Sequence, residues 1–461
     1  MGSKVISARI ALDSLTVLRS YLDDPVVAKY QRLLQSLRTA SFDGYAWLNN
    51  YADFYYTLLQ ANEIPSLKDY LLEKLLFCDS VFAKACEKQA LADIPPGITA
   101  AMVHDLNRLE QVALITAAEL KAAALERTAN SSYLAAMLPE LPEWDSTSPA
   151  ASSHGAAQAL LQKFAAAERW VDCLPELALF YQQHGSGNFA LYTGFRWERV
   201  GGVGRLQGIR AVDPIALRDL IGYEEERQQV IENTLMLLQG YPANNILLYG
   251  DRGTGKSSTV KAILNEFSQQ GLRMIELPQT LLEDLPLVIR EIKDRQQKFI
   301  IFVDDLSFAD NEERYTALKA VLEGGLESRP QNVVIYATSN RRHLIKERFS
   351  ERAGLQSDDV QDQVRAGDTI QEKLSLADRF GITITFLAPN QQNYLEIVAG
   401  LARQRQLQIE PAVLRQEALR WERWQNGRSP RTARQFIDWL EGQLAQNISG
   451  ENDKKSRNSV S

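Results

Sequence analysis

The sequence predicts an α/β protein, in which a parallel sheet covered by helices follows a mostly α-helical N-terminal domain. Two patterns lead to this prediction. From about residue 211, short and nearly continuous apolar runs alternate with helical segments, as in parallel sheets that are covered on both faces. Before about residue 129, apolar residues instead recur at helical spacing, as they do from Leu67 to Leu75. Residues 390–446 again show only helical patterns.

The strands of the parallel sheet are predicted from apolar runs that end in glycine or polar residues. An earlier pair of alternating runs, within residues 189–210, predicts a β-hairpin. Its GGVGRLQG stretch is interpreted as a turn and not as a dinucleotide fingerprint, because no helical pattern follows the glycines. The predicted parallel strands cover residues 245–250, 272–278, 299–305, 332–340 and 381–389.

Changes of composition predict the domain boundaries. Residues 138–157 are rich in proline, serine and alanine and are the expected linker. The polar residues 447–461 are expected to form a disordered tail. The other predicted parts are a helical N-terminal domain (1–137), a connecting segment of a helix and the hairpin (158–211), a nucleotide-binding α/β domain (212–389) and a helical lid (390–446).

The composition excludes several classes of protein. The chain has 461 residues, of which 45% are hydrophobic and 24% are charged, as in soluble globular proteins. No apolar run reaches the roughly 18 residues of a membrane helix, and no signal-peptide core is found. Cys78, Cys86 and Cys173 lack metal-ligand spacing and the four histidines are scattered, so no zinc site is expected. We expect buried thiols and a cytoplasmic location.

Charge is unevenly distributed along the chain. Residues 1–195 contain 15 Lys and Arg against 21 Asp and Glu, whereas residues 390–461 contain 11 against 8. Because phosphate binding requires cations, the acidic N-terminal part is not expected to bind nucleic acid. We expect it to bind an unidentified protein partner. The basic C-terminal part permits a nucleic-acid contact but does not indicate one.

The clearest motif is GDRGTGKS, residues 250–257, which fits the pattern G-x-x-x-x-G-K-[ST]. Its glycines allow backbone N–H groups to surround phosphate oxygens at the start of a helix. Lys256 is expected to reach the β- and γ-phosphates from an exposed loop, and Ser257 to bind magnesium. The expected nucleotide-binding residues of this loop are Gly250, Asp251, Arg252, Gly253, Thr254, Gly255, Lys256, Ser257 and Ser258.

Two strand ends after the P-loop carry polar residues. Ligands bind at the carboxyl ends of parallel strands, where adjacent carboxylates are costly without a cation. Asp304 is therefore expected to hold magnesium through its water shell, and Asp305 to polarise an attacking water. Asn340 is expected to hydrogen-bond the γ-phosphate or that water, although an ordinary turn asparagine would give the same pattern.

The order of these motifs resembles that of the AAA+ ATPases over residues 212–446. The P-loop, the acidic pair and the polar strand end are followed by EKLSLADRFGITITFLAPN and a helical region. The pattern is most similar to the replication-initiator and helicase-loader branch, and the whole chain resembles an uncharacterised bacterial family of single-module AAA+ proteins. The resemblance implies ATP and Mg²⁺ binding, a helical lid and a homo-oligomer.

The resemblance also implies further site residues. Arg379, in ADRFG, corresponds to the arginine finger that completes a neighbouring subunit's site. Arg431, in GRSPRTARQF, corresponds to the second sensor in the lid, and Arg434 is a weaker candidate for that role. The residues of LIGYEEE that correspond to the adenine cradle are Ile221, Gly222 and Tyr223.

The chain departs from the family pattern in ways that bear on function. Asp305 replaces the usual glutamate, which predicts slow turnover. The segment 341–378 is long for its place, and LPQTLLEDLP lacks the aromatic-glycine pore signature of protein unfoldases. No helix-turn-helix follows the lid.

Two hypotheses for the function result: an ATPase that loads or remodels a macromolecule, or an ATP-dependent assembly switch with slow hydrolysis. A small-molecule kinase is disfavoured, because the sensor and finger candidates suit hydrolysis better.

Overall fold

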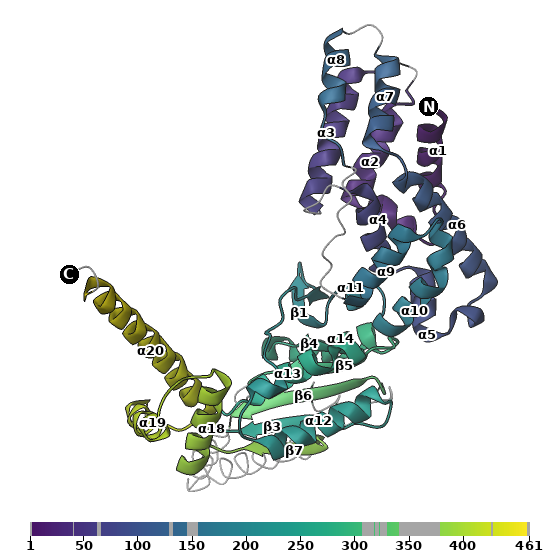
Figure 1. Cartoon of the computed structure of the whole chain (residues 1–461). Helices are drawn as coiled ribbons and strands as arrows, with labels where there is room; N and C mark the ends of the chain where they lie inside the picture. The colour runs from purple at the N-terminus through teal and green to yellow at the C-terminus, as the bar shows by residue number, and fades with distance from the viewer. Residues whose placement is uncertain are drawn as a thin grey trace. The chain divides into compact units, whose positions relative to one another are not determined.

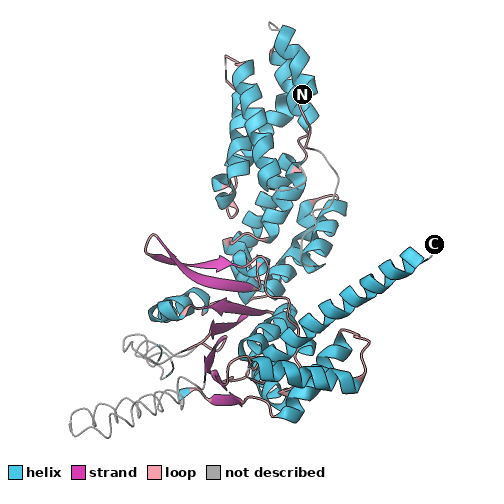
Figure 2. Cartoon of the chain, turned by 90° about the vertical axis from the view of Figure 1, so that its left-hand side faces the viewer, coloured by secondary structure: helices cyan, strands magenta, loops and turns pink. Residues whose placement is uncertain are grey.

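The chain forms two compact units, Met1–Leu191 and Tyr192–Ser461 (Figure 1). The first unit contains helices, and the strands lie in the second (Figure 2). The division between the two units falls before the hairpin, whereas the sequence predicts a boundary near residue 211. The computed structural model describes residues 2–39, 41–61, 66–128, 132–144, 155–306, 318, 322, 330–340, 379–425 and 427–458.

The helices of the N-terminal unit surround a single apolar core, in which Trp47, Tyr51, Leu106 and Tyr181 are fully buried. Short polar side chains begin several of these helices by accepting backbone N–H bonds, such as Asp24 before α2. The helices are α1 (Gly2–Asp13), α2 (Pro25–Ser36), α3 (Gly44–Ala61), α4 (Leu67–Leu76), α5 (Val81–Lys88), α6 (Pro96–Ala113), α7 (Ala117–Arg127), α8 (Ser132–Met137), α9 (Gly155–Ala166), α10 (Leu174–His184) and α11 (Asn188–Leu191).

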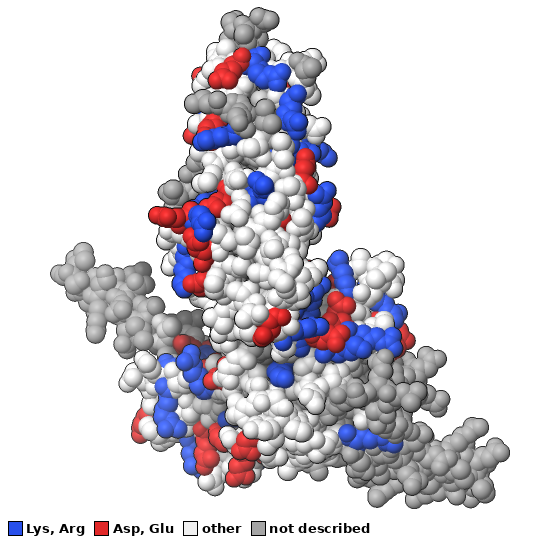
Figure 3. Space-filling model, turned by 90° about the vertical axis from the view of Figure 1, so that its right-hand side faces the viewer, with Lys and Arg blue, Asp and Glu red and all other residues white. Residues whose placement is uncertain are grey.

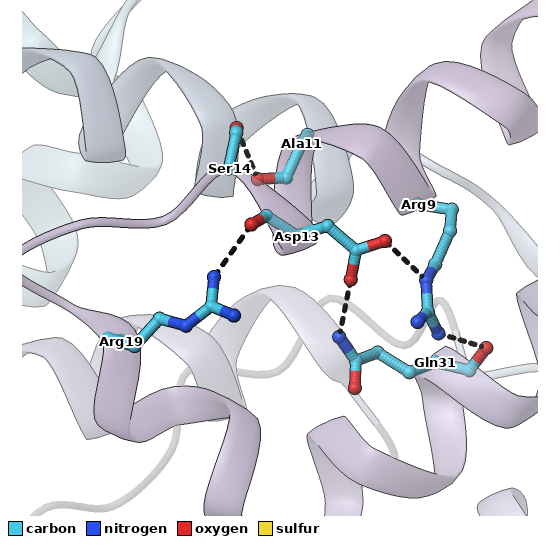
Figure 4. Close-up of polar contacts among 6 residues, drawn as sticks. All are labelled: Arg9, Ala11, Asp13, Ser14, Arg19 and Gln31. Carbon is cyan, nitrogen blue, oxygen red and sulfur yellow. Dashed lines mark hydrogen bonds and ion pairs between the residues drawn. The ribbon is translucent and has the colours of Figure 1, made fainter.

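Polar contacts at the end of α1 hold it against α2 (Figure 4). The Asp13 carboxylate accepts hydrogen bonds from Arg9 Nε at 2.9 Å and from Gln31 Nε2 at 3.2 Å. The Asp13 carbonyl accepts another from Arg19 Nη1 at 2.7 Å. One carboxylate and one carbonyl thus connect three segments, so the direction in which the chain leaves α1 is well defined.

The predicted linker over residues 138–157 does not separate two domains. Leu138 and Trp144 in its first part, and Ala157 at its end, are buried in the N-terminal core. The Trp144 ring lies 5.1 Å from that of Phe54, measured between centroids. Residues 145–154 lie outside the described residues. The polar composition therefore belongs to a connection within one unit, because apolar anchors on both sides return to the same core.

The second unit contains a seven-stranded sheet with the order β2-β1-β4-β5-β6-β3-β7. The five predicted parallel strands are confirmed, and the predicted hairpin turns at Gly201 and Gly202, which both have positive φ. The hairpin is not a separate connecting segment, because β1 pairs in parallel with β4 and extends the sheet. The strands are β1 (Gly194–Val200), β2 (Val203–Gly208), β3 (Ile246–Gly250), β4 (Leu272–Glu276), β5 (Lys298–Val303), β6 (Val333–Asn340) and β7 (Ile382–Phe386).

Helices of the second unit pack on the sheet or form the predicted lid, whose core includes Tyr394, Phe436 and Ile437. Part of the tail predicted to be disordered is helical in the structure, since α20 extends through Asn458. The segment 341–378 lies outside the described residues.

The described α-helices of the second unit are α12 (Glu224–Leu238), α13 (Lys256–Phe267), α14 (Leu285–Ile292), α18 (Gln391–Gln404), α19 (Pro411–Gln425) and α20 (Pro430–Asn458).

A search for membrane spans in the part of the chain that the structure describes found no helix with the length and apolarity to cross a bilayer.

Gly250 is required where β3 meets β7. Its φ is 142°, and a Cβ atom there would lie 2.0 Å from the carbonyl oxygen of Phe386. Because backbone cannot move aside as a side chain can, we expect Gly250→Ala to lower the free energy of unfolding by about 1–3 kcal/mol. Denaturant unfolding measures this change.

The matched control is Gly442→Ala in α20, where no atom lies within 4 Å of the added methyl group. This substitution should be neutral or stabilising, since alanine favours a helix over glycine by about 0.5–1 kcal/mol. Equal stabilities for the two variants would contradict the close approach.

Candidate nucleotide-binding site

A cavity of about 620 Å³ lies where the carboxyl ends of the strands meet the lid. Ligands bind at this edge in parallel α/β sheets. The P-loop forms one wall, the ends of β5 and β6 form another, and the lid closes the third side. The lining residues are Asp219, Leu220, Ile221, Tyr223, Arg227, Arg252, Gly253, Thr254, Gly255, Lys256, Ser257, Ser258, Thr259, Asp304, Asp305, Thr338, Asn340, Phe386, Ile397, Leu401, Pro430, Arg431 and Arg434.

The P-loop has the conformation that its glycines predict. Gly253 and Gly255 have φ values of 77° and 94°, and α13 begins directly after Gly255. The first N–H groups of this helix have no partner within the helix and can bind an anion. The lid touches the loop as well, because the backbone N–H of Arg431 donates to the Gly253 carbonyl at 3.2 Å.

Lys256 is buried, with only 6% of its surface exposed, so the expectation of an exposed loop position is wrong. Its Nζ donates to the carbonyl oxygens of Gly250 and Asp251, at 3.1 and 2.7 Å, and lies 3.4 Å from Asn340 Oδ1. Burial lowers the pKa of Lys256 to about 8, against the opposing effect of nearby carboxylates. The ammonium group thus lies where a ligand would bind, and it loses its proton as the pH rises through about 8.

Asp304 lies at the centre of a hydrogen-bond network. Its Oδ1 accepts from Ser257 Oγ at 2.6 Å and from Thr338 Oγ1 at 2.5 Å. The predicted pair of Ser257 and Asp304 therefore does come together. Thr338 was not among the predicted residues, although it could have been found from alternation, because it precedes Asn340 by two residues on the same strand.

The donors at this position suit magnesium. Mg²⁺ prefers oxygen ligands and is usually held by one or two protein groups together with water and phosphate oxygens. Ser257 and Asp304 supply a hydroxyl and a carboxylate oxygen. Among the residues that the structure describes, no group of three or more His, Cys, Asp or Glu side chains could hold a metal by itself. Ser257 and Asp304 would leave most positions around such an ion to water and phosphate oxygens.

Asp305 and Asn340 also meet. Asn340 Nδ2 donates a hydrogen bond to Asp305 Oδ1, and Asn340 Oδ1 faces the Lys256 ammonium. Asp305 has φ of 53°, which is uncommon for a residue other than glycine, although aspartate tolerates it better than most. Its N–H donates to Thr338 Oγ1 at 2.9 Å, which holds this backbone in place. The two predicted catalytic groups are therefore in direct contact.

The expected adenine cradle lines the opposite end of the cavity only in part. Ile221 and Tyr223 line it, whereas Gly222 is not among the lining residues. The Tyr223 ring stacks on Phe386, with centroids 5.3 Å apart, and its hydroxyl donates to the Leu387 carbonyl at 2.5 Å. Sequence patterns did not identify four other side chains at this end, which are Arg227, Phe386, Ile397 and Leu401.

Besides Gly222, three predicted residues lie outside the cavity wall. Gly250 and Asp251 connect the P-loop to the segment after β7, since Asp251 Oδ2 accepts from the Ala388 N–H at 2.8 Å. Arg379 is described just before β7 but is not among the lining residues. The lid candidates Arg431 and Arg434 both line the cavity, and Arg434 Nη2 lies 3.5 Å from the Asp219 carbonyl.

A P-loop that faces an acidic strand end and a helical lid, on a mainly parallel sheet, defines an AAA+ nucleotide-binding module. The particular protein family follows from the sequence: residues 190–444 match the family described as "Protein of unknown function (DUF815)", and the chain belongs to it. The branch of AAA+ proteins stays a prediction.

Curated relatives match a shorter region. The 26S proteasome regulatory subunit 4 homolog of Oryza sativa subsp. japonica is 33% identical over 121 residues, which cover 22% of this chain and 27% of that protein. Homolog B from Arabidopsis thaliana is 34% identical, with the same coverage. The chain thus spans about a quarter of the length of these relatives.

Among solved structures, a RuvB variant of Thermotoga maritima is similar over 48% of this chain and 62% of its own, with 17% identity and a TM-score of 0.32. The Thermotoga maritima RuvB Holliday junction branch migration motor is similar over 50% of this chain and 73% of its own, with 14% identity and a TM-score of 0.29.

The depressed pKa of Lys256 predicts proton uptake when phosphates bind. Negative phosphate oxygens favour the charged ammonium, so binding should raise this pKa above about 8. Near pH 9, the protein should take up most of one proton from solution when Mg-ATP binds. Near pH 6, Lys256 is already charged, so the protein should take up almost no proton on binding. Calorimetry in buffers of different ionisation enthalpy measures the uptake. Lys256→Arg is the control, because arginine does not titrate in this range, and equal uptake by that variant would contradict the assignment.

Proposed function

We propose that this protein binds and hydrolyses ATP and uses the resulting conformational change to load or remodel a macromolecular partner. The proposal rests on the 2.6 Å hydrogen bond between Ser257 Oγ and Asp304 Oδ1, because it joins a phosphate-binding loop to an acidic strand end. In P-loop NTPases, a loop hydroxyl and an acidic residue of this kind hold the magnesium ion. The relatives, among them a proteasome regulatory subunit, are consistent with this general role.

Each residue would have a separate task in the reaction. Ser257 and Asp304 would hold Mg²⁺, which supplies neutralising charge to the phosphates when bound. Lys256 would neutralise the β- and γ-phosphates as the N–H groups at the start of α13 surround them. Asp305 would orient and polarise the attacking water, and Asn340 would position that water or the γ-phosphate.

Ile221 and Tyr223 would contact adenine, and the turn at Gly222 would support them. Ile221 packs against Gly400 of α18, and Tyr223 packs against both the sheet core and the lid core. Arg431 is proposed to sense the phosphates from the lid. Because one ligand would contact both the sheet and α18, its hydrolysis and release would change the position of the lid.

The contact between Asn340 and Asp305 supports slow turnover. Asp305 is one methylene shorter than glutamate, and its Oδ1 already accepts a hydrogen bond from Asn340 Nδ2. A carboxylate held in this way must exchange that bond for one to water before it can act. The same observation favours a second candidate function, in which ATP binding drives assembly and slow hydrolysis only resets it.

Arg379 is proposed to act in the site of a neighbouring subunit, which would make the functional form a homo-oligomer.

The N-terminal unit is proposed to bind a protein partner in the cytoplasm. Basic and acidic side chains are interspersed on the face of this unit drawn in Figure 3, and residues 1–195 carry an acidic excess. Such a surface does not attract the phosphates of nucleic acid.

Lys256→Ala should reduce ATP affinity by about 10- to 150-fold, which corresponds to the roughly 1.5–3 kcal/mol of a hydrogen bond to a charged group. Lys261→Ala is the matched control on the same helix, because Lys261 is exposed and pairs with Asp213 at 3.3 Å. Titration calorimetry measures both affinities, and circular dichroism checks the fold. An unchanged affinity in folded Lys256→Ala protein would exclude the P-loop assignment.

Mixing two inactive variants tests the shared site. Arg379→Ala should lower turnover by about 10³–10⁵-fold with little change in ATP affinity, since an arginine finger acts mainly in the transition state. Asp305→Asn should be inactive by loss of the carboxylate. If Arg379 acts in trans, an equimolar mixture should recover part of the phosphate release, because some interfaces then combine both intact residues.

The control for this mixing experiment is each variant mixed with itself, which should stay inactive. No recovery, together with wild-type activity that does not depend on protein concentration, would mean that Arg379 acts within its own subunit.

A further inference from the structure

Helices α19 and α20 of the lid (Figure 1) carry three tryptophan side chains that contact one another. Trp424 is 74% exposed and Trp439 is 42% exposed. Both rings pack against Trp421, with centroid distances of 5.5 and 5.4 Å. We call Trp421, Trp424 and Trp439 the tryptophan patch. Because tryptophan is highly buried on average, exposed rings of this kind indicate a binding surface.

The cationic side chains of the lid are all arginines. Residues 390–446 contain eight arginines and no lysine, against six acidic residues. Four of these acids pair with three of the arginines, which are Arg405, Arg420 and Arg428. Within the described residues, the other five arginines have no carboxylate at ion-pair distance. One of the five, Arg423, directly precedes Trp424.

The surroundings of the patch do not suit an apolar protein interface. Among the described residues of the lid, Val413 is the only large exposed apolar side chain besides Trp424 and Trp439. A stable protein interface covers about 800 Å² on each partner around an apolar centre. Two exposed indole rings among arginines instead suit a ligand with flat rings and negative charges.

We propose that the tryptophan patch binds single-stranded nucleic acid. Unpaired bases would stack on Trp424 and Trp439, and the phosphates would contact Arg423. Arginine suits this role, because its planar guanidinium group binds phosphate and stacks on aromatic rings. A single strand is favoured over a duplex, in which the base faces are already stacked and unavailable. The net charge of −7 predicts modest affinity that falls with salt.

Fluorescein-labelled oligo-dT at low salt tests this proposal, with anisotropy and tryptophan fluorescence as readouts. The wild-type chain should bind the strand and lose tryptophan fluorescence as bases stack. Trp424→Ala should weaken binding by about 5- to 150-fold, which corresponds to the roughly 1–3 kcal/mol of one stacked base. Trp424→Phe should retain part of the affinity, because it keeps an aromatic face.

Two controls separate this surface from other sites. Tyr241→Ala removes a ring of the same unit that is 62% exposed and lies outside the lid, so it should leave oligo-dT affinity unchanged. Lys256→Ala should also leave it unchanged, because the P-loop is not the proposed strand site. The measurement needs no ATP, so its result is independent of the proposed ATPase activity.

Several outcomes would overturn the proposal. They are no binding of oligo-dT by the wild-type chain at low salt, equal affinity in Trp424→Ala, or tighter binding of a duplex than of the single strand. Loss of a protein partner in Trp424→Ala without any effect on oligo-dT would assign the patch to protein binding and would also exclude the proposal.

Discussion

The carboxylate of Asp304 joins parts of the nucleotide site that come from separate regions of the chain. Its bonds to Ser257 and Thr338 connect the first turn of α13 with the ends of β5 and β6. Both are charge-assisted hydrogen bonds, which are shorter and stronger than those between neutral groups. The distance between the P-loop and the acidic strand end is therefore set by the protein itself, and any ligand that bridges them meets groups already in position.

The lid depends on the same loop. Gly253 packs against Ser429 and Arg431, and the Arg431 N–H bonds to its carbonyl. At the other end of the cavity, Tyr223 connects the sheet core to the lid core through its ring. The lid is thus attached at both ends of the cavity. Because Arg431 and Trp439 both belong to α20, one helix connects the P-loop end of the cavity with the tryptophan patch.

Strands and the P-loop of this protein can be predicted from its sequence, whereas the domain boundaries cannot. The composition of residues 138–157 predicts a linker. Trp144 and Ala157 contradict this interpretation, because a buried ring or methyl group on each side returns the chain to one core. The hairpin was likewise assigned to a connection, although its alternating pattern is equally consistent with an edge of the main sheet.

The sequence alone determined the local features of this protein. The glycines at 253 and 255, the strand before them and the helix after them are specified by residues close in the chain, because backbone preference and apolar periodicity are short-range properties. The tertiary structure decided which side chains complete the site. Thr338 reaches Asp304 across 34 residues, and Tyr223 meets Phe386 because α12 packs against β7 of the sheet. It also decided that Lys256 is buried, since its environment consists of the ends of strands that only folding brings together.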